Sequence, residues 1–438
     1  MWPWRPFVYL SLTMAVLPGF LLGGLMFLAV YMGWPLGWYA AARQAHGHAQ
    51  LMGWGGAMIL GVGLQFLPRL RGAKLWSPHW VPPLFVMLAL GMTVRIVAQP
   101  LAAALSGSAM PWLVLLVAGT GVETVAVIGL LVVLVQTLRQ GPALGQKAAF
   151  AQIVPMLAVA GGGLVVALGA WTAGTWGLLA SGGQGTASSL LADPVLQNLG
   201  VATATFVFVP ALCLAMSARV FPLFFRIRTT APAPLNVAAW LLAGALAAYL
   251  STAVIPPALG WGIGAVLNAA GLLVGAYAIQ VFTRRVEFPG DKGQYRTWAD
   301  PHAVGALTAY AWAVAGALAL AVYGLYRLGI PVGPHPPPLD LAIHALGAGF
   351  MTLLIIGVGP VLLSAFAGSR PAGGAWLWAA VITGNAAALL RTVFLMGPAP
   401  ARNALLALAG LLGAVSMAAF ALCLWVSVYR RTASGSRA

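Results

Sequence analysis

The chain alternates between long apolar blocks and short polar turns. Each block has about 20 to 25 residues, which is the length that an α-helix needs to cross a hydrocarbon core of roughly 30 Å. We therefore predict twelve membrane-spanning helices. Their expected ranges are 7–31, 47–67, 81–104, 112–136, 150–172, 195–218, 235–254, 259–282, 303–326, 341–364, 375–396 and 403–428.

Composition supports this fold class. Of the 438 residues, 61% are hydrophobic and 6% are charged, whereas soluble proteins carry about a quarter charged residues. No segment between the blocks is long enough for a folded soluble domain. We expect an all-α, polytopic membrane helix bundle that forms a single integral membrane domain over residues 1–438, with a short cytoplasmic tail at 429–438.

The basic residues predict the orientation. The chain holds 22 Lys and Arg against 6 Asp and Glu, and these basic residues lie between the spans, which argues against nucleic acid as a partner. If the spans alternate in direction, 17 of them fall on one side, 3 on the other, and Arg95 and Arg391 lie within spans. Since cytoplasmic loops are enriched in Lys and Arg, both termini are expected in the cytoplasm and the protein in the inner (plasma) membrane.

Several predicted helix starts carry a carboxylate next to proline. Asp193 precedes Pro194, and Asp300 precedes Pro301. Asp340 follows a run of three prolines. Asp at the N-cap and Pro in the first turn are both favoured at helix N-termini.

Few charged or titratable side chains lie inside the spans, and each is a candidate for function because burying charge in a membrane is costly. Arg95 lies in the third span, Glu123 in the fourth and Arg391 in the eleventh. His46, His48 and His344 lie near the starts of the second and tenth spans, which run in the same direction. Together with Arg95 and Arg391, they are expected to converge on the outer third of the membrane.

This set suggests a b-type haem near the outer face. One histidine of the second span and His344 would supply two axial imidazoles, and the arginines would bind the haem propionates. His46 and His48 point about 200° apart on a regular helix, so they cannot both face one pocket. The alternative is that the histidines bond to loop carbonyls and that Arg95 pairs with Glu123.

The other histidines and the cysteines are weaker candidates. His302 follows the Asp300 cap and is expected at a helix start, while His79 and His335 lie beside prolines in loops. Cys213 and Cys423 are far apart in sequence and have no CxxC partner, which excludes a disulfide framework and a c-type haem attachment site.

Residues 46–54, HGHAQLMGW, resemble the H-x-H-E-M-L-F-G-F motif of the NnrS family. Further motifs follow in the family's order: ARVFPLF at 218–224 resembles G-R-V-I-P-F-F, AYAW at 309–312 resembles G-Y-A-W, IHAL at 343–346 resembles L-H-A-L, and ALLR at 388–391 is similar to A-L-L-R. Ala49 and Gln50 replace the family's Glu and Met, and Leu307 replaces a family His. The likeness spans nearly the whole chain.

The resemblance implies a haem- and copper-containing membrane protein of twelve spans, linked to nitric oxide metabolism and the nitrosative stress response, or to electron transfer from a membrane donor. It also implies that His46, His48 and His344 are metal ligands, supported by Arg95, Arg219 and Arg391. The cofactors expected from it are haem b and copper. The sequence assigns no reaction, so whether the chain is an enzyme stays open.

Three other classes of function were weighed. A secondary transporter using Arg95, Glu123 and Arg391 as its substrate or ion site fits twelve spans, although the chain shows neither a halved sequence repeat nor the paired broken helices of transporters. A terminal haem-copper oxidase requires histidines in the sixth and seventh spans, which contain none. An assembly protein without chemistry also fits the scarcity of acidic residues in the membrane.

Overall fold

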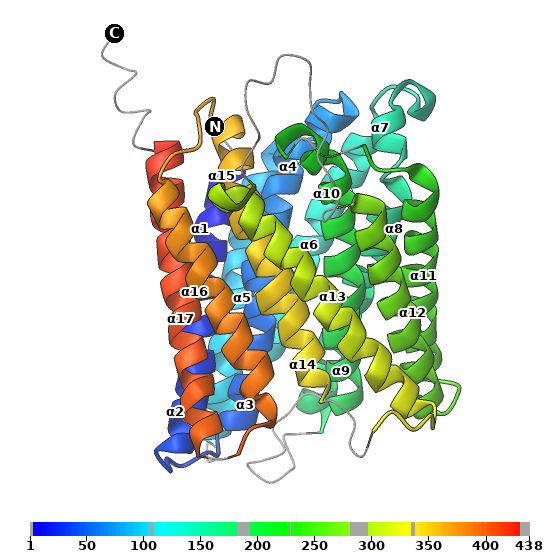
Figure 1. Cartoon of the computed structure of the whole chain (residues 1–438). Helices are drawn as coiled ribbons and strands as arrows, with labels where there is room; N and C mark the ends of the chain where they lie inside the picture. Colours follow the sequence, from blue (N-terminus) through cyan, green and yellow to red (C-terminus); the bar gives the residue numbers. More distant parts are fainter. Residues whose placement is uncertain are drawn as a thin grey trace. The chain divides into compact units, whose positions relative to one another are not determined.

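The protein is described by a computed structural model (Figure 1), which covers residues 3–105, 109–181, 193–225, 227, 229–280, 297–333, 338–398 and 400–429. Twelve helices in this part of the chain are long and apolar enough to cross a membrane, and it contains no β-strand. The prediction of a polytopic helical membrane protein is therefore confirmed. His335 and nearly all of the predicted tail at 429–438 lie outside the described residues.

The spans consist of α-helices, several of which are interrupted by π-helical segments. The label η marks π-helical segments (η1, η2, η7, η9 and η11) and short 3₁₀ helices (η3 and η10). The first six spans contain α1 (Arg5–Met14), η1 (Ala15–Leu21) and α2 (Leu22–Tyr31); α3 (Tyr39–His48), η2 (Ala49–Gly56) and α4 (Ala57–Arg71); η3 (Pro78–Trp80) and α5 (Val81–Ala104); α6 (Ala109–Arg139); α7 (Ala148–Ala151) and α8 (Val154–Ala180); and α9 (Pro194–Ala202), η7 (Thr203–Phe208) and α10 (Val209–Phe224). The other six contain α11 (Pro232–Ser251); α12 (Pro257–Ile279); α13 (Pro301–Arg327); α14 (Leu339–His344), η9 (Ala345–Met351) and α15 (Thr352–Phe366); α16 (Gly374–Val393) and η10 (Phe394–Met396); and α17 (Ala401–Leu424) and η11 (Trp425–Tyr429).

The predicted helix starts are partly right. The Asp193 carboxylate accepts hydrogen bonds from two backbone N–H groups of the first turn of α9, and Asp300 accepts one from the N–H of His302. The second span, however, begins at Tyr39 rather than at residue 47, so His46 and His48 lie well inside a helix. Asp340 also lies at a helix start, in the first turn of α14 after its N-cap Pro338, and its side chain bonds to Arg391.

The chain packs as two compact units. Unit 1 comprises residues 1–150, 164–204 and 396–414, and unit 2 comprises residues 151–163, 205–395 and 415–438. The second and third spans belong to unit 1, and the tenth and eleventh belong to unit 2. Each unit therefore contains its own share of the candidate site residues.

Small residues allow the helices of unit 1 to approach closely. A Cβ atom at Gly91 of α5 would lie 2.7 Å from the carbonyl oxygen of Gly119 on α6, and a Cβ at Gly119 would lie 2.8 Å from the carbonyl oxygen of Gly91. The α5 and α6 backbones are thus in direct contact, as in small-xxx-small packing of membrane helices. This contact brings Arg95 of α5 and Glu123 of α6 into the same layer of the unit.

Candidate functional site

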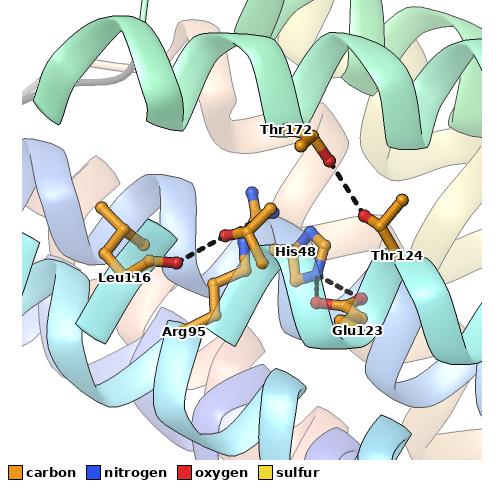
Figure 2. Close-up of polar contacts among 7 residues, drawn as sticks. His48, Arg95, Leu116, Glu123, Thr124 and Thr172 are labelled. Atoms are coloured by element: carbon orange, nitrogen blue, oxygen red, sulfur yellow. Dashed lines mark hydrogen bonds and ion pairs between the residues drawn. The ribbon is translucent and has the colours of Figure 1, made fainter. Parts of the chain in front are cut away.

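His48 and Glu123 form a hydrogen-bonded pair buried in unit 1. The Nε2 atom of His48 lies 2.8 Å from Oε1 and 2.9 Å from Oε2 of Glu123, and both side chains are at most 1% exposed. A carboxylate only accepts hydrogen bonds, so Nε2 carries the proton and donates it. His48 lies at the end of α3 and Glu123 in the middle of α6, so two spans are joined by this contact (Figure 2).

Arg95 lies beside this pair without bonding to it. Figure 2 shows the His48 ring between the side chains of Arg95 and Glu123. The Nη1 atom of Arg95 donates to Oγ1 of Thr120 at 3.4 Å, a long hydrogen bond. The expected alternative of a direct Arg95–Glu123 bridge is therefore wrong, because His48 takes the carboxylate.

Trp171 completes the surroundings of the pair. The guanidinium carbon of Arg95 lies 5.6 Å from the centre of the Trp171 ring, within the range of a cation–π contact. The His48 ring meets the same indole edge-on, with ring centres 4.8 Å apart. Gly200 of α9 provides room for this indole, since a Cβ there would lie 2.4 Å from Trp171 Nε1. Trp171 was not singled out from the sequence, because a tryptophan in an apolar block carries no distinguishing signal.

His46 points to a different neighbour. Its Nδ1 atom lies 2.9 Å from the carbonyl oxygen of Gly19 in the first span, and Gly23 lies against its ring. Because α3 is regular up to His48, the two histidines face different elements, as their spacing predicts. A carbonyl oxygen only accepts, so Nδ1 of His46 carries the hydrogen.

The candidate residues of unit 2 form a second cluster. The Nδ1 atom of His344 lies 2.9 Å from the carbonyl oxygen of Asp340 and 3.3 Å from its carboxylate Oδ1. The Nη2 atom of Arg391 donates to Oδ2 of Asp340 at 2.6 Å. His344 and Arg391 thus both contact Asp340, which was expected only as a residue of the helix start.

Unit 2 also contains two further sets of polar contacts that were not expected from the sequence. The Nδ1 atom of His302 lies 2.9 Å from the carbonyl oxygen of Gly357. The Nε1 atom of Trp312 donates to Oδ1 of Asn385 at 3.1 Å, and Nδ2 of Asn385 donates to the Thr308 hydroxyl at 3.2 Å. An asparagine in the middle of an apolar block was a usable signal for this network.

The remaining candidates are less organised. Arg219 is half-buried in α10, and its Nε atom has no hydrogen-bond partner in the described part of the chain. Within the same residues, no group of three His, Cys, Asp or Glu side chains is placed to hold a metal ion. The convergence of His46, His48, His344, Arg95 and Arg391 on one pocket stays a prediction.

The two clusters lie in two copies of a sequence repeat. The repeat is shorter than half of the chain and was not recognised from the sequence. Arg95 follows His48 by 47 residues, and Arg391 follows His344 by the same 47. Aligned without gaps on these residues, the two segments also share an alanine after the histidine, a Gly-Val-Gly triplet and a tryptophan. The shared positions are 49 and 345, 61–63 and 357–359, and 80 and 376.

The structure supports this alignment. The π-helical segments η2 and η9 begin directly after the two histidines, at Ala49 and Ala345. The next turn contains a left-handed glycine in both copies, Gly72 with φ 71° and Gly368 with φ 64°. Glycine adopts this conformation without a steric penalty. The left-handed turn therefore explains why both copies have glycine at this position. Segments of π-helix occur frequently at functional sites.

The sixth span also contains a π-helical segment, but no histidine precedes it. Its π-helical segment begins at Thr203, and the residue before it is Ala202 rather than histidine. This span therefore offers no imidazole at that position.

Comparison with models of known protein families and with curated proteins gave no match.

Proposed function

We propose that this chain is a haem-binding protein of the inner (plasma) membrane, similar to the NnrS family, which acts in nitric oxide metabolism or in membrane electron transfer. The observation that carries the proposal is the hydrogen bonding of His344. Its Nδ1–H is held by the carbonyl and the carboxylate of Asp340. In a neutral imidazole the other nitrogen, Nε2, then offers a lone pair, and this is the arrangement that metal-binding histidines use.

His46 is the better candidate for a second ligand from the second span. Like His344, it donates Nδ1–H to a backbone carbonyl, so its Nε2 has the lone pair that a metal requires. His48 instead donates Nε2–H to Glu123. We therefore assign His48 a positioning role in the buried hydrogen-bonded pair and keep it as the alternative ligand.

Haem b, when bound, supplies an iron that exchanges single electrons and binds small ligands such as nitric oxide. Within unit 2, His344 is the candidate ligand of the iron and Arg391 the candidate partner of a propionate; within unit 1, the candidates are His46 and Arg95. Asp340 already occupies one amino group of Arg391, so a propionate at Arg391 would share the guanidinium with this carboxylate. Copper, as the second metal implied by the resemblance, has no three-residue cluster to support it within the described residues.

An absorption spectrum of the purified protein tests the proposal. We expect a reddish protein with a b-type pyridine haemochrome, and a Soret band that shifts on addition of nitric oxide. His344→Ala is expected to lose or alter the spectrum, and His79→Ala, at an exposed site, is the control. A colourless, fully folded protein purified from haem-supplemented cells would reject the proposal. Elemental analysis of the same sample reports copper.

The repeat favours a second candidate function. Transporters are commonly built from repeats in which discontinuous helices carry the substrate site, and here the second and tenth spans are interrupted beside a histidine in both copies. A secondary transporter would use Arg95, Glu123 and Arg391 to bind its substrate or a coupling ion. Uptake into proteoliposomes that is lost in Glu123→Gln, with haem absent, supports this function over the first.

A further inference from the structure

One of the differences between the two copies of the repeat decides whether the arginine has a carboxylate partner. Asp340 lies four residues before His344, and the equivalent position before His48 is Gln44. In unit 2 the Asp340 carboxylate binds Arg391 directly. In unit 1 the Gln44 side chain accepts a hydrogen bond from Gln99. Arg95 therefore lacks the carboxylate that its counterpart has.

Glu123 does not replace this carboxylate. Both of its oxygens lie within 2.9 Å of His48 Nε2, and the one hydrogen bond of Arg95 among the described residues is the long one to Thr120. Arg95 is 2% exposed, and its Nε atom has no acceptor in this part of the chain. Buried polar groups are nearly always hydrogen-bonded, so this donor calls for an acceptor that the chain does not provide.

A second unsatisfied donor lies on a side chain that contacts Arg95. The Nε1 atom of Trp171 is also buried and lacks an acceptor within the described residues, and the indole lies against the Arg95 guanidinium. Arg95 and Trp171 thus each carry a buried N–H group that has no acceptor among the described residues. The planar guanidinium binds carboxylates in a two-point geometry.

We propose that Arg95 binds a small carboxylate from outside the chain, in the role that Asp340 has for Arg391. Arg95, His48 and Trp171 are each at most 2% exposed, so the ligand is expected to be no larger than formate or acetate, or to be the carboxylate end of a longer molecule. The inference deepens the second candidate function by naming its substrate class. It does not depend on haem, although a haem propionate carries the same group.

The Gln44–Gln99 pair lies next to the proposed site. Gln44 precedes His48 by one helical turn on α3, and Gln99 follows Arg95 by one turn on α5. The two amides thus form the next polar layer towards the end of the unit where α3 begins. Arg43, adjacent to Gln44, is exposed and adds positive charge at that end.

Equilibrium binding of radiolabelled formate to the full-length protein in lipid nanodiscs tests the proposal. We expect saturable binding that unlabelled acetate displaces and that neutral acetamide does not. Arg95→Gln is expected to abolish it. Arg95→Lys, which keeps the charge but loses the planar fork, is expected to weaken it about tenfold or more. Size-exclusion profiles of both variants confirm that they are folded.

Two exchanges between the copies sharpen the test. Gln44→Asp would give Arg95 the internal partner that Arg391 has, so formate binding is expected to fall about tenfold or more while the arginine stays in place. Asp340→Asn would remove the carboxylate that binds Arg391, so a second formate site is expected in unit 2. Loss of binding in Gln44→Asp cannot come from a missing cation, which makes this variant the stricter one.

The result that overturns the proposal is the absence of saturable formate binding, or binding that Arg95→Gln or Gln44→Asp retains. Displacement by acetamide as effective as by acetate overturns it as well. Formate binding that is present in haem-free protein and blocked after haem loading supports the site and identifies a propionate as its occupant. Binding that haem does not affect supports a free carboxylate, and uptake assays then report the transport function separately.

Discussion

The Nε2 atom of His48 donates to both carboxylate oxygens of Glu123, at 2.8 and 2.9 Å, in the interior of a membrane bundle. Neither side chain reaches solvent. Charged groups at such depth are costly to bury and are kept mainly for function. This pair joins α3 to α6 and orients the imidazole next to Arg95.

Glu123→Ala is expected to destabilise the protein strongly. The variant leaves the buried His48 Nε2–H without an acceptor, which costs about 1 to 3 kcal/mol, and the cavity left by the carboxylate adds to this cost. Glu123→Gln retains an acceptor for His48 Nε2–H and is expected to lose about 1 to 2 kcal/mol. Thermal unfolding in detergent, followed by a thiol-reactive dye at the buried Cys213 and Cys423, measures both. An Ala variant as stable as the Gln variant would contradict the prediction.

Arg391→Met is expected to have a much smaller effect on stability. Its partner Asp340 is 41% exposed, and ion pairs that reach solvent contribute about 0 to 1 kcal/mol. The same unfolding assay should place this variant within about 1 kcal/mol of the wild type. A loss comparable to that of Glu123→Ala would show that the Asp340 cluster is as deeply buried as the His48 pair.

Gly119→Ala is expected to loosen the contact between α5 and α6. The added Cβ would lie 2.8 Å from the Gly91 carbonyl and 2.9 Å from the Arg95 backbone nitrogen, and neither backbone atom can move aside easily. Overpacking of this kind costs about 1 to 3 kcal/mol. Gly121→Ala is the matched control, since nothing lies within 4 Å of its added Cβ. Equal melting temperatures for the two variants would rule out a tight crossing at Gly119.

His46→Ala and His48→Gln separate the two ligand assignments. If His46 binds the haem iron, His46→Ala is expected to shift the Soret band of the purified protein. His48→Gln is expected to keep the wild-type spectrum, because the His48 ring is held by Glu123 rather than by iron. The reverse outcome in these spectra would assign the ligand to His48.

Local sequence patterns were sufficient to predict the helices. They were insufficient to predict which side chains of different helices contact one another. The block lengths predicted all twelve spans, and Asp193 and Asp300 cap the helices as expected. The start of the second span was placed too late, since the moderately polar turn around Gln44 reads as a loop although it is helical and buried. The pairing of Glu123 with His48 rather than Arg95 depends on which faces of α3, α5 and α6 meet, and hydropathy does not report this.

The sequence by itself determined that this chain is a helical membrane protein with three intramembrane charges, because length and apolarity are properties of each segment alone. The tertiary structure decided which nitrogen of His46, His48 and His344 is engaged, and that Arg391 has a carboxylate of its own while Arg95 has none within the described residues. These choices follow from contacts between residues distant in sequence. Such contacts are set by helix packing, where glycines allow backbones to approach within van der Waals distance.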